Sequence, residues 1–175
     1  CIRDRYYSNS ITIKNNTISQ SAYGVELSDS SNSQVVNNTI SDTSYGTFLG
    51  FSNNNNVSAN TFVNNSWSIY LTSSNSNIVG QNDASGGSVG IQVRYSIGNS
   101  VIKNTAGNNS YGIYLAYCGA NTLSGNTAKL NDWGIELYGS TGSAIKENTL
   151  RDNTWGMFID ANSDGNGIYH NNFIN

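Results

Sequence analysis

Glu136 and Asp160 are the two residues of this sequence whose types and spacing suggest acid and base chemistry. They lie 24 residues apart, which is one 22-residue repeat of the chain plus two positions. If successive repeats stack as neighbouring parallel strands, this offset puts the two backbones about 8 Å apart. A general acid and a general base at such a separation could flank a glycosidic bond.

Arg94 falls at the same repeat position as Asp160, which makes it the third candidate for a carbohydrate-active site. An active site would require Glu136, Asp160 and Arg94 to converge at a cleft, and the irregular stretch 160–165 could form its wall. Two carboxylates on a surface are commonplace, however, and nothing in the sequence shows that either one is buried. We therefore assign no catalytic residue and keep these three as candidates only.

A second functional signal is an outward-facing aromatic surface. The middle residue of a repeated strand forms one outward column, and another follows two positions later. Sugar rings stack on aromatic faces while their hydroxyls find polar partners, although aromatic residues also favour exposed strand positions without any ligand. The residues that we expect to contact a glycan are Tyr70, Gln92, Tyr114, Glu136, Tyr138 and Phe158.

The elements that position these residues come from a repeat of 22 residues. Residues 111–115, which read Tyr-Gly-Ile-Tyr-Leu, are one of seven copies, and no insertion separates one copy from the next. The second residues of the copies are Gly24, Gly46, Ser68, Gly90, Gly112, Gly134 and Gly156. A fixed period of 20–50 residues indicates a solenoid, a propeller or an array.

The spacing inside each copy predicts strands. Apolar residues two apart, such as Ile113 and Leu115, have the period of a strand, and no window has the period of a helix. We expect an all-β parallel solenoid of about eight coils with three short strands per coil, forming a single domain over residues 1–175. A one-residue slip after Ile159 predicts a slightly longer loop at 160–165.

Asparagine also recurs with the same period. Asparagine tolerates the left-handed conformation of sharp bends, and stacked amides can form a hydrogen-bonded ladder along the axis. The column that we expect to occupy such bends and to form such a ladder contains Asn16, Asn38, Asn60, Asn82, Asn104, Asn126, Asn148 and Asn171.

Composition narrows the range of partners. The net charge of −3 gives no basic surface for nucleic acid, and no apolar run approaches the roughly 18 residues of a membrane span. The soft and imidazole metal donors are scattered along the chain as Cys1, Cys118, Met157 and His170. Copper needs such donors in a cluster, so we predict neither a metal site nor another cofactor.

The repeat, with its aromatic-Gly-Ile-x-Leu line followed by Ser, Asn-x-Ile/Val and Asn-Thr, resembles that of NosD-like right-handed parallel β-helix proteins. The resemblance covers essentially the whole chain. It implies a right-handed parallel β-helix within a wider group of carbohydrate-binding proteins and sugar hydrolases. Some NosD-like proteins are associated with copper handling, a role that the scattered donors of this chain do not support.

Three functions remain open from the sequence. The first is a non-catalytic secreted or cell-surface module, part of a longer protein, that acts as a rigid scaffold and binds polysaccharide through the aromatic face. The second is a carbohydrate-active enzyme, a glycoside hydrolase, lyase or epimerase, that works on the same face. The third is a structural protein whose copies stack end to end through unpaired strand edges.

Overall fold

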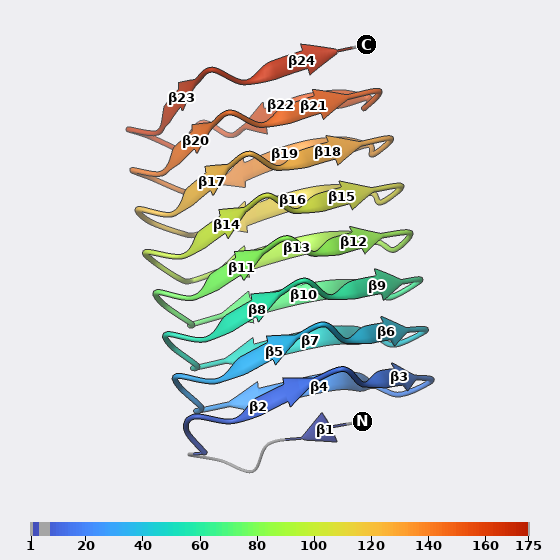
Figure 1. Cartoon of the computed structure of the whole chain (residues 1–175). Helices are drawn as coiled ribbons and strands as arrows, with labels where there is room; N and C mark the ends of the chain where they lie inside the picture. The colour runs from blue at the N-terminus through green and yellow to red at the C-terminus, as the bar shows by residue number, and fades with distance from the viewer. Residues whose placement is uncertain (1, 4–7, 175) are drawn as a thin grey trace.

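Each 22-residue repeat folds into one coil of three short strands, and successive coils stack along one axis (Figure 1). The computed structural model describes residues 2–3 and 8–174. Every strand pairs in parallel with the equivalent strand of the neighbouring coil, so that Ile69 lies opposite Ile91 and Val79 lies opposite Val101. Three eight-stranded parallel sheets result, which confirms the predicted parallel β-helix.

The three sheets, called A, B and C here, differ in strand length. Sheet A contains β1 (Ile2–Arg3), β4 (Tyr23–Ser28), β7 (Tyr45–Gly50), β10 (Trp67–Thr72), β13 (Val89–Arg94), β16 (Tyr111–Ala116), β19 (Trp133–Tyr138) and β22 (Trp155–Ile159). Sheet B contains β2 (Thr12–Lys14), β5 (Gln34–Val36), β8 (Asn56–Ser58), β11 (Ile78–Gly80), β14 (Ser100–Ile102), β17 (Thr122–Ser124), β20 (Ala144–Lys146) and β23 (Gly167–Tyr169). Sheet C contains β3 (Thr17–Ser19), β6 (Thr39–Ser41), β9 (Thr61–Val63), β12 (Asp83–Ser85), β15 (Thr105–Gly107), β18 (Thr127–Lys129), β21 (Thr149–Arg151) and β24 (Asn172–Ile174).

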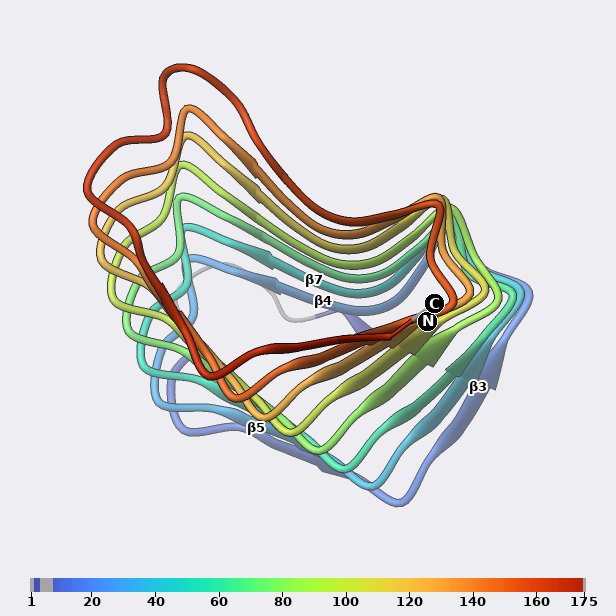
Figure 2. The same cartoon turned by 90° about the horizontal axis from the view of Figure 1, so that it is seen from above.

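Seven complete three-strand turns run from β2 to β22, with β1 before them and β23 and β24 after them. The predicted number of about eight coils was therefore slightly high. Viewed along the axis, the turns follow one common outline, and the last turn, in dark red, leaves it at one corner (Figure 2). Within the part of the chain that the structure describes, no helix is long and apolar enough to cross a membrane.

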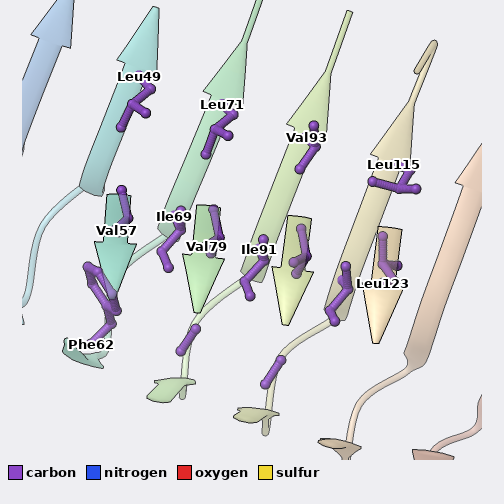
Figure 3. Close-up of a cluster of buried hydrophobic side chains, with 14 of the residues drawn as sticks. Leu49, Val57, Phe62, Ile69, Leu71, Val79, Ile91, Val93, Leu115 and Leu123 are labelled. Atoms are coloured by element: carbon purple, nitrogen blue, oxygen red, sulfur yellow. The ribbon is translucent and has the colours of Figure 1, made fainter. Parts of the chain in front are cut away.

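The core consists of stacked rows of apolar side chains. Leu49, Leu71, Val93 and Leu115 come from successive sheet A strands and form one row (Figure 3). All four side chains are fully buried, as predicted from the apolar columns. Each buried residue of this size contributes roughly 1.5–3 kcal/mol by leaving water, so the rows supply most of the driving force for coil stacking.

The asparagine column forms the expected ladder. Asn104 Nδ2 donates to Asn126 Oδ1 of the next coil at 3.0 Å and to the Val79 carbonyl oxygen at 2.9 Å. Its own Oδ1 accepts from the Asn82 backbone N–H at 3.0 Å. A further column that the sequence prediction did not include consists of two shorter pieces. Thr43 donates its N–H to Asn65 Oδ1, and a separate ladder runs from Gly87 N–H through Asn109 and Asn131 to Asn153.

The expectation that ladder asparagines themselves adopt the left-handed conformation is wrong. In the described chain this conformation belongs to the residue before each one, such as Ala59 before Asn60 and Lys103 before Asn104, both with φ of 55°. The ladder residue that follows then points its side chain into the coil, where Asn104 is 1% exposed. The bend therefore needs an asparagine for hydrogen bonding, whereas its left-handed position accepts several residue types.

The one-residue slip lies where it was predicted. Leu137 pairs with Ile159, 22 residues later, but Ser140 donates its N–H to Ser163 Oγ, 23 residues later. The extra residue is accommodated in the turn at 160–163, which explains why the last turn leaves the common outline in Figure 2.

Candidate functional site

The outer surface of sheet A has two neighbouring rows of side chains, because both the first and the fourth residue of each strand face outward. In β16, Gly112 and Ile113 are buried, whereas Tyr111 and Tyr114 are half-buried on the outside. A side chain on Gly112 would lie 2.5 Å from the Gly134 carbonyl oxygen. The glycine thus allows the close approach of the next coil.

Aromatic rings fill the space between the two rows in the N-terminal half. Tyr45 stacks on Tyr23 at 5.0 Å and on Trp67 at 5.1 Å between ring centroids. Phe48, from the second row, packs edge-on against Tyr45 at 5.8 Å and against Tyr70 at 5.6 Å. These rings cover one another, which explains how so many aromatic side chains are accommodated on one sheet.

A hollow opens on the same surface where Glu136 occupies the position that Phe48 has in β7. It is a pocket of about 290 Å³ lined by Tyr111, Trp133, Glu136, Trp155 and Phe158. Tyr111 and Trp133 stack at 4.8 Å with an angle of 9° between their planes. Parallel pairing places Glu136 directly between Tyr114 and Phe158, so four rings and one carboxyl group from β16, β19 and β22 meet here.

The electrostatics of the pocket are set by Glu136. Burial raises the pKa of its carboxyl group, and the nearby Asp160 carboxylate adds to the effect. Burial and the Glu136 charge in turn raise the pKa of Tyr114 to about 12. Among the residues that the structure describes, none forms an ion pair or hydrogen bond with the Glu136 carboxyl group. Glu136 is therefore a half-buried acid, and the described part of the chain gives its carboxyl group neither a cation nor a hydrogen-bond donor.

Asp160 serves the turn that follows β22. Its Oδ1 accepts hydrogen bonds from Ser163 Oγ at 2.5 Å and from the Gly139 backbone N–H at 2.8 Å. These two hydrogen bonds lower the pKa of the Asp160 carboxyl group. The Oδ1 atom of Asp160 is thus engaged in holding the turn that accommodates the slip, while Oδ2 accepts one longer hydrogen bond from Asn162 Nδ2 at 3.3 Å.

Arg94 does not join the two carboxylates. Its position in β13 pairs with Ala116, which pairs in turn with Tyr138, so Arg94 lies two strands away from β19. The guanidinium group lies over the Tyr95 ring, 4.7 Å from its centroid, and donates to the Tyr95 hydroxyl at 3.0 Å. The structure therefore does not bring together the three residues that the sequence offered as catalytic candidates.

The six residues predicted to contact a glycan have different environments. Glu136 and Phe158 line the pocket, and Tyr114 is the register neighbour of Glu136. Tyr70 stacks against Tyr45 at 5.9 Å, and Tyr138 is 39% exposed beside the Tyr117 ring.

Gln92, in contrast, is only 9% exposed. Its Oε1 accepts a hydrogen bond from Trp67 Nε1 at 2.9 Å, so the Trp67 ring covers the amide. The residue has a structural partner, and it is the least accessible member of the predicted glycan-contacting set.

Three pocket residues were not predicted as ligand contacts. Tyr111, Trp133 and Trp155 are the first residues of their repeat copies, which the sequence shows only as a periodic aromatic position. A second unpredicted group consists of Tyr95 and Tyr117, which stack at 5.2 Å. Both are about half exposed in left-handed bends, with φ of 48° and 55°.

The described metal donors, Cys118, Met157 and His170, have different surroundings. Cys118 Sγ is buried and donates to the Val93 carbonyl oxygen at 3.2 Å, and burial raises the pKa of the thiol. Met157 packs against the core, and exposed His170 follows β23. Across residues 2–3 and 8–174 no three His, Cys, Asp or Glu side chains gather as metal ligands. Cys1 lies outside the described residues, and the donors that are described do not fit copper.

Solved structures with the same architecture include the periplasmic alginate epimerase AlgG and the A-module of the Azotobacter vinelandii mannuronan C-5 epimerase AlgE6. An AlgG double mutant is 19% identical, with a TM-score of 0.81 over 94% of this chain and 51% of that chain. AlgE6 is 12% identical, with a TM-score of 0.67 over 94% of this chain and 58% of that chain. The chain thus spans little more than half the length of these epimerases, and at this identity the likeness shows the fold alone.

No curated protein sequence gives a significant match to the chain. Two family models do match. The right-handed β-helix region covers residues 5–84, and NosD, described as a periplasmic copper-binding protein, covers residues 66–175. Because the NosD match spans more than half of the sequence, and the repeat and fold agree with it, the chain belongs to the NosD family of right-handed β-helix proteins.

Proposed function

We propose that this protein is a non-catalytic β-helix module, one domain over residues 1–175, that binds polysaccharide on the outer surface of sheet A. The observation that carries the proposal is the pocket around Glu136, where four aromatic side chains surround one carboxyl group. Apolar sugar faces stack on rings while hydroxyls need a nearby acceptor. The hollow on the outer face of sheet A provides aromatic rings for stacking and a carboxylate acceptor for hydroxyls.

The coil stack suits the role of a rigid scaffold. Ladders of asparagine and serine connect every coil to the next, so the rings of the pocket are held on three strands that cannot move independently. A preorganised surface loses little conformational freedom on binding, which favours affinity for an extended polymer.

The proteins that this chain resembles support the proposal of a polysaccharide ligand and of a location in the cell envelope. The similar solved structures are named as epimerases of alginate and mannuronan, which are polysaccharides. NosD and AlgG are both described as periplasmic. We therefore place this protein in the cell envelope, on the surface or in the secreted space.

An enzyme on the same surface is the second candidate. The pKa of Glu136 is raised while that of Asp160 is lowered, and acid and base pairs of glycosidases are separated in this way. The hydrogen bonds that hold Asp160 in its turn argue against this use. Shortened or epimerised products from an oligosaccharide panel, lost in Glu136→Gln, would favour the enzyme over the binding module.

Binding of oligosaccharides to wild type and to Trp155→Ala tests the proposal. Trp155 is 56% exposed and lines the pocket, so its loss should weaken binding by about tenfold, the worth of one stacked ring. Titration calorimetry with neutral, amino and acidic oligosaccharides gives the affinities. Phe51→Ala is the matched control, because Phe51 is 64% exposed but lies in the bend after β7. Equal binding by wild type and Trp155→Ala, or no binding at all, would refute the proposal.

A further inference from the structure

We propose that the Glu136 pocket selects a positively charged sugar, so that the glycan recognised is one that carries ammonium groups, such as a polymer of amino sugars. The inference rests on the proposed function and adds the chemical class of the ligand. It is carried by the chemistry and the surroundings of the five residues that line the pocket.

The first argument is the carboxyl group without a partner. Glu136 is half-buried among rings, and within the described residues no cation or hydrogen-bond donor reaches it. A buried charge is costly unless it is paired. A ligand ammonium group would supply the missing partner and would favour the ionised form of the carboxyl group.

The second argument is the composition of the wall. Tyr111, Trp133, Trp155 and Phe158 surround the hollow, and two of these rings are indoles. The face of an aromatic ring is negative, and a cation within about 6 Å of its centroid is attracted, most strongly by tryptophan. A neutral hydroxyl is not attracted to the rings in this way. The aromatic wall therefore adds to the preference for an ammonium group that the Glu136 carboxylate creates.

The third argument is the charge around the pocket. The lining contains no lysine or arginine. The Asp132 and Asp160 charges act on Tyr111 and Glu136 and add to the negative potential. Arg94 of β13 is engaged with Tyr95 and lies two strands away from β19. A uronate polymer would therefore meet charge of its own sign here, unlike a polymer of amino sugars.

The size of the pocket limits the bound group. Pockets for drug-sized ligands have volumes of about 300–1,000 Å³. At about 290 Å³ this hollow lies at the small end, which suits one sugar unit whose neighbours extend along the sheet. The ammonium group would point towards Glu136 while the ring stacks on an indole.

Calorimetric titration with three oligosaccharides of equal length tests the inference: glucosamine oligomers, N-acetylglucosamine oligomers and oligouronates, at a pH where the amine is protonated. Wild type should bind the glucosamine oligomer at least about tenfold more tightly than the acetylated one. Glu136→Gln should remove this preference. Glu26→Gln is the matched control, since Glu26 has the same repeat position in β4 and should leave the preference unchanged.

The outcomes separate the inference from the proposed function. Equal affinity for amino and acetylated oligomers, tightest binding of the uronate, or an unchanged preference in Glu136→Gln would overturn the inference while glycan binding stands. Failure of every oligosaccharide to bind would overturn both. Thermal unfolding of each variant establishes that a lost affinity does not result from a lost fold.

Discussion

The outer row of sheet A is closed beside Phe48 and hollow beside Glu136. Phe48 and Glu136 have the same place in the repeat, four coils apart. Phe48 contacts the rings on both sides and closes the space, whereas Glu136 is narrower and leaves a pocket between Trp133 and Trp155. The same backbone framework thus holds a packed ring at one height and a pocket at another.

Glu136→Gln should increase stability at neutral pH. The pKa of Glu136 is raised on folding, so the folded state holds this proton more tightly than the unfolded state. Stability therefore falls as pH rises from the unfolded pKa, about 4.3, through the raised folded pKa. The other titratable groups that act on one another around Glu136 are Asp132, Asp160, Tyr111 and Tyr114.

Urea unfolding at pH 3 and at pH 7 measures this effect. The variant and wild type should unfold at the same urea concentration at pH 3, where the carboxyl group is protonated in both states, and the variant should be more resistant at pH 7. A variant that is less stable than wild type at pH 7 would contradict the prediction.

The site could be predicted from the sequence only in part. The outward column containing Tyr114, Glu136 and Phe158 follows from the repeat, because strand alternation decides which side chains face out. The pocket itself does not follow, since it depends on how the Trp133 and Trp155 rings pack beside a smaller neighbour. The turn at Asp160 was expected as a loop, but its hydrogen bonds to Ser163 and Gly139 depend on local geometry.

Strands and bends of a coil are stabilised in different ways. The strands gain from burying rows of apolar side chains, whereas the bends depend on ladders in which each amide serves two coils. The repeat predicted the strands because their requirement, an apolar residue at every second position, is visible in the sequence. It did not predict which bend residue is left-handed, because Ala59 and Lys103 show no common side-chain chemistry at that position.

Asn104→Ala should be strongly destabilising. Asn104 accepts from Asn82 and donates to Asn126 and Val79, so its truncation leaves several buried groups without a partner. Each such group costs about 1–3 kcal/mol, which predicts a loss of at least about 3 kcal/mol in the free energy of unfolding.

Asn16→Ala is the control for this prediction, because Asn16 is only half-buried and its Nδ2 donates to the carbonyl oxygen of exposed Lys14 and to Asn38 Oδ1, which keeps the Asn16 backbone N–H as a donor after truncation. Its cost should not exceed about 1 kcal/mol. Chemical denaturation of both variants gives the two values. Equal losses would show that the interior of the ladder carries no extra stability.

The stability of this 175-residue chain should also vary along its axis. A stack of repeats is stabilised mainly by contacts between neighbouring coils, and a coil at one end has only one neighbour. Val79 and Ile168 belong to the same apolar column, yet Val79 is fully buried and Ile168 is 39% exposed. Phe62 and Phe173 differ in the same way, at 1% and 56%.

Hydrogen exchange of this chain should follow that gradient. Peptides covering β11 and β12 should exchange at least about tenfold more slowly than peptides covering β23 and β24, a difference of about 1.4 kcal/mol in local opening. Mass spectrometry after timed exchange measures the rates. Uniform protection from β2 to β24 would instead indicate that the stack opens only as a whole.

The unbroken register from β4 to β22 also has a genetic consequence. Ile91 lies between Ile69 and Ile113 of the neighbouring coils, and the ladder residue Asn82 lies in the same way between Asn60 and Asn104. A recombination event that duplicates or deletes 22 codons would therefore join surfaces that already fit. Rods of different length can arise by such events without new packing solutions, and a pocket like that around Glu136 can then be placed at a different height by point mutation of one outward column.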